Sequence, residues 1–503
     1  MMMLGKFRNY VQVIGKVKTT RFNKGLNLNS KTYREFVLYI FPSFDKANMS
    51  IEKLLKLCRF LSFMKLYNKV TILAGMGAYL DGFDLIVISA AISLISVTFN
   101  ITSSSVSGLL IGTAFLGGFF GALFLGKLVD KYGRRIMFLT DLFLFVGGTL
   151  ITALSVNLPM IFVGRALVGL AIGADISVSW TMVAEYSPKN RRGALLSYQF
   201  ILWGLGAISS YLILFAVLSA GNMAWRIAFL IGLIPAVLVL IMRRSIPESP
   251  RWLISHGKEN EAFEILKTND ITLSKSSISA LEIESKDLKD STTMTLFSRK
   301  YIRLSTGVFI AQFLAFFIVI PANLYTPKIL LLVGFSKQFS ILLLGSAFVW
   351  IFNVLGFLGG SLLLDKIGRR NVAGFAFIPL AAILLTLWIT ITYINIDVFF
   401  LLWILVEFLS AFGASVTWAW SSELFPTAIR GFAMGFNGSA NRLIGFFGSY
   451  ILAVLLAISL KLVYLTCFII GIGLVFVVMI WINVEAKGKD LEDISELRTE
   501  GVE

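Results

Sequence analysis

Histidine and cysteine are nearly absent from this chain, and their scarcity excludes several kinds of chemistry. His256 is the one histidine and stands in a polar stretch, so no imidazole is available inside the apolar segments to shuttle protons or to bind a metal. Cys58 and Cys467 are too few to build a disulfide framework. The apolar segments contain no nucleophile–base pair, which argues against an enzyme. We therefore expect no metal and no cofactor, and any proton chemistry must use carboxylates.

Charged residues are scarce as well. They make up only 15% of the 503 residues, whereas 57% are hydrophobic and the mean hydropathy is +0.82. A soluble protein of this length needs far more polar surface to cover its core. Composition therefore predicts an all-α integral membrane protein, in which apolar runs of about 20 residues mark the transmembrane helices. Twelve such runs fall near residues 70–97, 105–127, 136–156, 158–183, 194–218, 225–243, 303–325, 338–364, 372–394, 397–421, 432–457 and 459–483.

One long polar connection, residues 244–302, divides the twelve runs into two sets of six. Lysine and arginine are concentrated in the short loops after runs 2, 4, 8 and 10, so the positive-inside rule makes these loops, the long connection and both termini cytoplasmic. We expect a multi-pass protein of the cell membrane. Its expected segments are a basic cytoplasmic extension at 1–68, an N-terminal six-helix bundle at 69–243, a cytoplasmic central loop at 244–302, a C-terminal six-helix bundle at 303–484 and a cytoplasmic tail at 485–503.

The N-terminal extension carries much of the net charge of +16. Residues 1–68 hold 13 lysines and arginines against three acidic residues. Residues 51–67 mix basic residues with leucine and phenylalanine, as an interfacial helix on anionic lipid does. Two other interpretations fit the same pattern: a positively charged lead-in to the first span, and translation that starts at Met49. We expect no cleaved signal peptide, because no short apolar core followed by small residues opens the chain.

An internal repeat relates the two halves of the chain. "GKLVDKYGRR" at 126–135 returns as "SLLLDKIGRR" at 361–370, an offset of 235 residues. "AEYSPKNRRG" at 184–193 returns as "SELFPTAIRG" at 422–431, an offset of 238 residues. A repeated six-span half indicates a transporter in which one half rocks against the other around a site between them.

These motifs resemble those of the major facilitator superfamily, in its sugar-porter-like branch. The resemblance covers residues 69–494 and includes "RALVGLAIG" at 165–173, an arginine followed by spaced small residues, and "PESPRWL" at 247–253, the signature that follows span 6. It implies twelve helices in two six-helix bundles, alternating access and no chemical catalysis. The partners that we expect are a small-molecule substrate, protons and the lipid bilayer, with no nucleic acid, and we expect a monomer.

Charged residues of the repeated loops form the expected cytoplasmic gate. In the family, such residues pair across neighbouring helix ends and hold the outward-facing state. Ordinary surface pairs contribute only about 0–1 kcal/mol each. We favour a gate because the set occurs in both halves of the chain. Its expected members are Gly126, Asp130, Gly133, Arg134, Arg135, Glu185, Arg192, Glu248, Arg251, Asp365, Arg369, Arg370, Glu423 and Arg430.

Charged residues inside the apolar runs are costly and mark functional sites by default. "LDGFD" at 80–84 places Asp81 and Asp84 on one helix face. By the resemblance, Asp84 and Arg165 stand where proton-coupled sugar porters have a titrating aspartate and its arginine partner; a tether between two helices is the structural alternative. Burial favours the neutral carboxyl group and a nearby guanidinium the charged one, so such a pair can couple proton transfer to conformation. The expected proton-coupling residues are Asp81, Asp84, Arg165, Asp175 and Glu407.

The expected substrate-binding residues point to two substrate classes. Trp418 and Asn441 match the span-10 tryptophan and the span-11 asparagine of sugar porters, whereas the family's span-7 amides are replaced by apolar residues. "LDGFD" resembles span 1 of aromatic-acid and phosphate symporters. Arg442 stands where those anion transporters keep a basic residue, and a guanidinium suits a carboxylate or a phosphate. The full expected set is Gln199, Gln312, Asn323, Tyr325, Trp418, Asn441 and Arg442.

Together these features predict a secondary active transporter, a proton-coupled symporter of a small solute. We favour an organic acid or other anion over a sugar or polyol, because of Arg442 and the altered span 7. A facilitated uniporter is a further alternative, since a buried aspartate can be structural. A nutrient sensor that binds without transporting is another, and the extension at 1–68 would then be its signalling segment.

Overall fold

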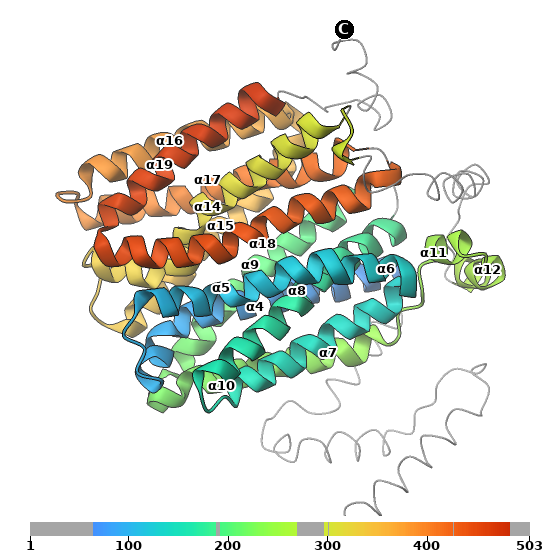
Figure 1. Cartoon of the computed structure of the whole chain (residues 1–503), viewed down its shortest axis with the longest axis horizontal. Helices are drawn as coiled ribbons and strands as arrows, with labels where there is room; N and C mark the ends of the chain where they lie inside the picture. The colour runs from blue at the N-terminus through green and yellow to red at the C-terminus, as the bar shows by residue number, and fades with distance from the viewer. Residues whose placement is uncertain (1–63, 188–191, 269–295, 300, 426, 483–503) are drawn as a thin grey trace, which may run out of the picture. The chain divides into compact units, whose positions relative to one another are not determined.

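The computed structural model describes residues 64–187, 192–268, 296–299, 301–425 and 427–482, and the chain from Lys65 onward forms one compact unit. In this described part every regular element is a helix, as the composition predicts (Figure 1). The elements are α4 (Leu66–Thr98), α5 (Ser104–Phe120), η2 (Gly121–Leu125), α6 (Gly126–Tyr132), α7 (Arg134–Ala153), α8 (Leu158–Tyr186), α9 (Arg192–Ala216), η4 (Leu218–Met223), α10 (Ala224–Arg243), α11 (Pro250–Ser255), α12 (Glu259–Thr268), α14 (Ile302–Leu332), α15 (Phe339–Ile367), α16 (Arg369–Thr390), α17 (Ile396–Glu423), α18 (Thr427–Ile458), α19 (Leu460–Phe476) and η6 (Val477–Ile482).

Twelve helical segments of the described residues are long and apolar enough to cross a bilayer, at the places that the sequence predicts. Several helices run beyond the apolar residues that mark them. α4 begins at Leu66 rather than at residue 70, and α14 ends at Leu332 rather than at residue 325. Backbone hydrogen bonds continue past the hydrocarbon boundary, because helix ends reach the headgroup region, where polar side chains are tolerated. The division of the chain at residues 68, 243, 302 and 484 stays a prediction, and residues 1–63 and 483–503 lie outside the described residues.

The helices form two bundles that correspond to the two halves of the sequence. In Figure 1 the blue-to-green helices α4–α10 make up one bundle and the yellow-to-red helices α14–α19 the other. Between the bundles, α5 packs against α18, and α9 packs against α15. α5 and α18 are the second and eleventh of the twelve spans, and α9 and α15 are the fifth and eighth. Moving each span by six places along the chain converts one pair into the other. The packing therefore has the twofold relation that the sequence repeat predicts.

Two glycines show the repeat in the backbone itself. Gly133 separates α6 from α7 with φ 96° and ψ 156°, and Gly368 separates α15 from α16 with φ 92° and ψ 158°. These positive φ angles are unfavourable for any residue with a Cβ atom, which accounts for the glycine in both copies of the "GRR" motif. The end of the bundles that carries these turns, with Arg134, Arg135, Arg369 and Arg370, is called the motif end below (right in Figure 1).

The outer faces of the helices carry large apolar side chains. Phe375 is 66% exposed, Ile469 59% and Ile472 52%. Water would disfavour such a surface, whereas lipid chains solvate it. The fold therefore has the apolar exterior that a bilayer requires, and it leaves the interface between the bundles for polar groups.

Candidate transport site

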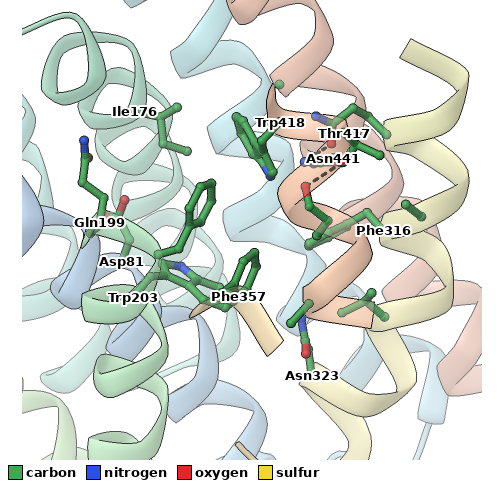
Figure 2. Close-up of a pocket in the computed structure, with 18 of the residues that line it drawn as sticks. Asp81, Ile176, Gln199, Trp203, Phe316, Asn323, Phe357, Thr417, Trp418 and Asn441 are labelled. Carbon is green, nitrogen blue, oxygen red and sulfur yellow. Dashed lines mark hydrogen bonds between the residues drawn. The ribbon is translucent and has the colours of Figure 1, made fainter. Parts of the chain in front are cut away.

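A cavity lies between the two bundles, lined by α4, α8 and α9 on one side and by α14, α15, α17 and α18 on the other (Figure 2). The space that atoms leave free is about 990 Å³, part of it open to solvent, and the centres of water molecules can occupy about 120 Å³. Most of the predicted polar residues line this cavity: Asp81, Asp175, Gln199, Gln312, Asn323, Trp418, Asn441 and Arg442.

Side-chain amides supply most of the uncharged polar groups in the cavity. Asn441 Nδ2 donates to Gln312 Oε1 at 3.0 Å, which joins α18 to α14 (dashed at Asn441 in Figure 2). Both polar atoms of Gln199, and the Oδ1 atoms of Asn323 and Asn441, have no hydrogen-bond partner among the described residues. Buried polar groups are normally paired, so these atoms are available to a ligand that brings hydroxyl groups or to water.

Asn353 of α15 also lines the cavity, although it is not among the residues predicted from the sequence. Its Nδ2 atom donates to Glu407 Oε2 at 2.8 Å, while its Oδ1 atom has no partner among the described residues. Its one signal was a lone amide within a long apolar run. Glu407, predicted to couple protons, is fully buried on α17 and lies behind Asn353 rather than at the cavity surface.

Aromatic pairs join the two bundles beside the amides. Trp180 of α8 stacks on Trp418 of α17, with ring centroids 5.7 Å apart and planes at 12°. Phe200 of α9 stacks on Phe357 of α15, with centroids 4.9 Å apart and planes at 3°. Only Trp418 was predicted. The other three look like ordinary apolar span residues in sequence, and only the docking of the bundles pairs them.

Tyr325, predicted to bind substrate, does not reach the cavity. Its hydroxyl donates to the backbone oxygen of Ser449 on α18 at 2.6 Å. Two positions along α14 separate it from Asn323, which does line the cavity, and they rotate the side chain by about 200° around the helix axis. The structure therefore places Tyr325 in the packing between α14 and α18.

Asp84 and Arg165 form the ion pair that the sequence predicts. Arg165 Nη1 contacts Asp84 Oδ2, and Arg165 Nη2 lies 3.4 Å from the backbone oxygen of Asp84. The two side chains are 1% and 0% exposed, and neither lines the cavity. The pair thus ties α4 to α8 inside the N-terminal bundle; its role in coupling stays a prediction.

Asp175 has an arginine partner that is not among the residues predicted from the sequence. Arg243 Nη2 lies 2.8 Å from Asp175 Oδ1, and Arg243 Nη1 lies 2.8 Å from Asp141 Oδ2. The guanidinium also donates to the backbone oxygen of Leu73 at 3.2 Å, so α4, α7, α8 and α10 meet there. In the sequence, Arg243 ends an apolar run and resembles an ordinary positive-inside residue. Asp81, by contrast, makes no ion pair and no hydrogen bond with any described residue.

Glu248 accepts several hydrogen bonds at the motif end of the N-terminal bundle. Its Oε1 atom accepts the backbone N–H of Arg134 at 2.9 Å, and its Oε2 atom accepts that of Arg135 at 3.1 Å. A carboxylate thus caps the N-terminus of α7, where it satisfies free N–H groups and complements the helix dipole. Burial raises the pKa of Tyr186, whose hydroxyl donates to the backbone oxygen of Glu248 at 2.8 Å. Arg134 Nη2 lies 3.4 Å from Glu185 Oε1.

The remaining predicted gate residues are only partly brought together. Arg135 Nη2 donates to the backbone oxygen of Arg244 at 3.2 Å, and Arg369 Nη1 donates to that of Leu364 at 3.2 Å. Gly126 begins α6, Arg370 is exposed, and Arg251 Nε has no partner among the described residues. The side chains of five predicted members lie outside the described residues: Asp130, Arg192, Asp365, Glu423 and Arg430.

Replacing Glu248 with alanine is expected to weaken the motif end. α7 loses a charged cap, at a cost of about 1–2 kcal/mol of folded-state stability. We expect a lower apparent melting temperature in detergent and slower transport, while Glu248→Gln, which keeps one acceptor oxygen, falls between the two. Glu259→Ala on the exposed first turn of α12 is the matched control. Equal melting of Glu248→Ala and wild-type protein would show that the cap contributes nothing.

Comparison with known proteins finds relatives that cover most of the chain. The sequence model of the "Sugar (and other) transporter" family matches residues 70–497. The arabinose-proton symporter of Bacillus subtilis is 30% identical, with 84% of this chain and 93% of that protein covered. The niacin transporter NiaP of Acinetobacter baylyi is 26% identical, with 84% and 94% covered.

Solved structures show the same fold. The major facilitator superfamily proton:xylose symporter XylE, bound to 6-bromo-6-deoxy-D-glucose, superimposes with a TM-score of 0.73 at 24% identity, with 86% of this chain and 99% of that chain covered. An inward-open form of XylE from E. coli gives a TM-score of 0.69 at 23% identity, with 86% and 99% covered. The chain therefore belongs to the Sugar (and other) transporter family: it is a multi-pass membrane protein with the major facilitator fold, a transporter and not an enzyme.

Proposed function

We propose that this protein is a proton-coupled symporter of a sugar or polyol that works by alternating access. The observation that carries this proposal is the cavity itself: buried amide atoms without a partner among the described residues and the Trp418 ring face it, between two bundles related by a repeat. Amides pair with sugar hydroxyls, and an aromatic face suits the apolar face of a sugar ring. An arabinose-proton symporter and a glucose transporter are among the relatives at 30% identity.

The Asp84–Arg165 pair is the proposed coupling element. Both side chains are buried, so the carboxylate is stable only while the guanidinium stays in contact. Rocking of the bundles that shifts α4 against α8 separates the two groups, and Asp84 then takes up a proton. Return of the guanidinium expels the proton. Each conformational cycle thus moves a proton together with the substrate.

We propose that the stacked aromatic pairs close the cavity toward the motif end. Trp418 lies five residues before the end of α17, and Trp180 lies six residues before the end of α8, so both are near the motif end. The bundles cannot separate there without unstacking Trp180 from Trp418 and Phe200 from Phe357. The proposed gate residues at the motif end also oppose separation of the bundles there. We propose that this end is cytoplasmic, in a cell-membrane protein that functions as a monomer with both termini inside.

Transport of an organic acid or other anion is the second candidate. The sequence by itself favours this candidate over a sugar or polyol, whereas the relatives support the sugar or polyol better. One observation still favours an anion: Arg442 lines the cavity, and no carboxylate of the described residues makes an ion pair with it. The niacin transporter among the relatives shows that the family extends beyond sugars.

Uptake into proteoliposomes tests both candidates. With an acidic exterior, we expect wild-type protein to concentrate at least one neutral sugar or polyol from a panel that also contains aromatic acids, dicarboxylates and phosphate. Collapse of the pH gradient with a protonophore should remove the accumulation but leave equilibrium exchange. Accumulation of anions alone would move the assignment to the second candidate. Equal uptake with and without the gradient would indicate a uniporter.

A further inference from the structure

Two lone charges of opposite sign face the cavity from opposite bundles. Asp81 belongs to α4 and Arg442 to α18, and both line the cavity. Neither makes a hydrogen bond or an ion pair with a described residue, although they are close enough for their charges to interact. The guanidinium of Arg442 lies over the ring of Phe115, 5.9 Å from its centroid. A cation held only by an aromatic ring remains open to a stronger anionic partner.

The other charges around Asp81 are already paired. On α8, Asp175 contacts Arg243 of α10, and Arg165 contacts Asp84 of α4 itself. α9 presents Gln199 and Trp203 to the cavity, which are uncharged. Arg442 is therefore the one cation of the described cavity wall that lacks an ion-pair partner, and Asp81 is the matching anion. With Asp81 ionised, the two charges cancel when the cavity holds no substrate.

A substrate with a carboxylate changes this balance. Its carboxylate can bind Arg442 in a bidentate manner, in competition with Asp81. Asp81 would then be a buried carboxylate without a cation, which is strongly unfavourable in a membrane. Uptake of one proton by the carboxylate of Asp81 removes that cost and keeps the total charge of the cavity unchanged. Proton binding at Asp81 and anion binding at Arg442 therefore favour each other.

The amides of the same cavity specify the rest of the substrate. Gln199, Asn323, Asn353 and Asn441 each carry a buried polar atom without a partner among the described residues. An unhydroxylated aromatic or aliphatic acid would leave these atoms unpaired, at a cost for each group. A hydroxylated acid satisfies them. The cavity thus combines an anion site with several hydroxyl sites.

Building on the proposed function, we propose that the sugar cavity also accepts a sugar acid, whose carboxylate binds Arg442 and whose hydroxyls bind the cavity amides, and that Asp81 takes up one proton as this anion binds. Asp81 is then a specificity-determining proton site that is separate from the coupling pair Asp84–Arg165. A neutral sugar carries no carboxylate and needs no such second site.

D-glucuronate and D-glucose are matched probes, because they differ only in a carboxylate against a hydroxymethyl group. Binding to purified protein is followed by the fluorescence of the cavity tryptophans across a series of pH values. We expect wild-type protein to prefer glucuronate, and its affinity to weaken about tenfold per pH unit over the range in which Asp81 loses its proton, as linkage of one proton requires. Asp81→Asn should bind glucuronate without this pH dependence.

Arg442 variants separate charge from shape. Arg442→Gln should lose at least tenfold in glucuronate affinity and keep glucose binding, whereas Arg442→Lys, which retains the charge, should keep part of the glucuronate affinity. Arg244→Gln, the same substitution at an exposed position at the motif end, is the matched control and should bind both probes like wild-type protein. The lysine variant keeps the test valid if Arg442→Gln fails to fold.

Two results would overturn the proposal. Glucose bound and accumulated in proteoliposomes without any glucuronate binding would show that Arg442 serves only to neutralise Asp81, while the proposed sugar symport would stand. Glucuronate binding with the same pH dependence in Asp81→Asn and wild-type protein would move the proton to another group. Failure of both probes to accumulate in response to a pH gradient would instead count against the proposed symport.

Discussion

An Asp84→Asn variant is expected to lose all proton-driven accumulation of substrate, down to the level of protein-free liposomes. Asparagine mimics the protonated carboxyl group permanently, so the variant cannot release a proton when the bundles return. Asp84 is in contact with Arg165 and is 1% exposed, so no solvent ion can replace its charge. Substrate binding should persist, because Asp84 does not line the cavity. Counterflow of labelled substrate across equal concentrations should therefore continue.

The comparison of gradient-driven uptake with counterflow decides the role of Asp84. Asp397→Asn, at an exposed position near the start of α17, is the control and should transport like wild-type protein. Removal of one partner leaves Arg165 as a buried unpaired charge, so the double variant Asp84→Asn/Arg165→Gln, neutral at both positions, guards against misfolding. Accumulation against a gradient by a folded Asp84→Asn protein would make the pair a tether between α4 and α8.

An Arg243→Leu variant is expected to show the largest loss of stability among single substitutions. The guanidinium contacts Asp175 and Asp141 at 2.8 Å each and is fully buried. Its removal leaves two carboxylates without a cation, and breaking one buried pair typically costs about 3–5 kcal/mol. Space around the group is tight, because a Cβ atom at Gly77 would lie 2.6 Å from an oxygen of Asp175. We expect little folded protein, measured as the monodisperse fraction in detergent and the apparent melting temperature.

A rescue experiment distinguishes lost charge balance from lost packing. The triple variant Arg243→Leu/Asp141→Asn/Asp175→Asn has no uncompensated charge at this site and should recover most of the folded fraction. Arg244→Leu changes the exposed neighbouring arginine in the same way and should melt like wild-type protein. If Arg243→Leu itself melts like wild-type protein, the four helices are held together by apolar packing alone, and the cluster has no structural role.

The repeated halves place these two sites in the same bundle. The coupling pair, the Arg243 cluster and Asp81 all belong to α4–α10, whereas Arg442 and most of the amides belong to α14–α18. The groups proposed to bind protons thus lie in one bundle, and most of the amides proposed to bind substrate lie in the other. A rocking motion changes their mutual distance, which is what the coupling of proton and substrate movements requires.

Sequence alone determined the architecture. A bilayer demands about twenty apolar residues for each crossing, so the length and spacing of the apolar runs fixed the number and order of the spans. The glycines of the two "GRR" turns and the offset of 235 residues between the motif copies revealed the repeat before any coordinates. The charges inside the spans were also visible, because an intramembrane aspartate or arginine stands out against an apolar background.

Only the tertiary structure decided which of these groups meet. Arg243 lies 68 residues from Asp175 and 102 residues from Asp141, and nothing local links them. Asn323 lines the cavity and Tyr325 does not, although both are polar residues of one span. A helix that is apolar on every side has no pattern that says which face turns inward. Its rotation, tilt and partners are set by contacts between distant helices, and these contacts build the cavity, its aromatic pairs and its charges.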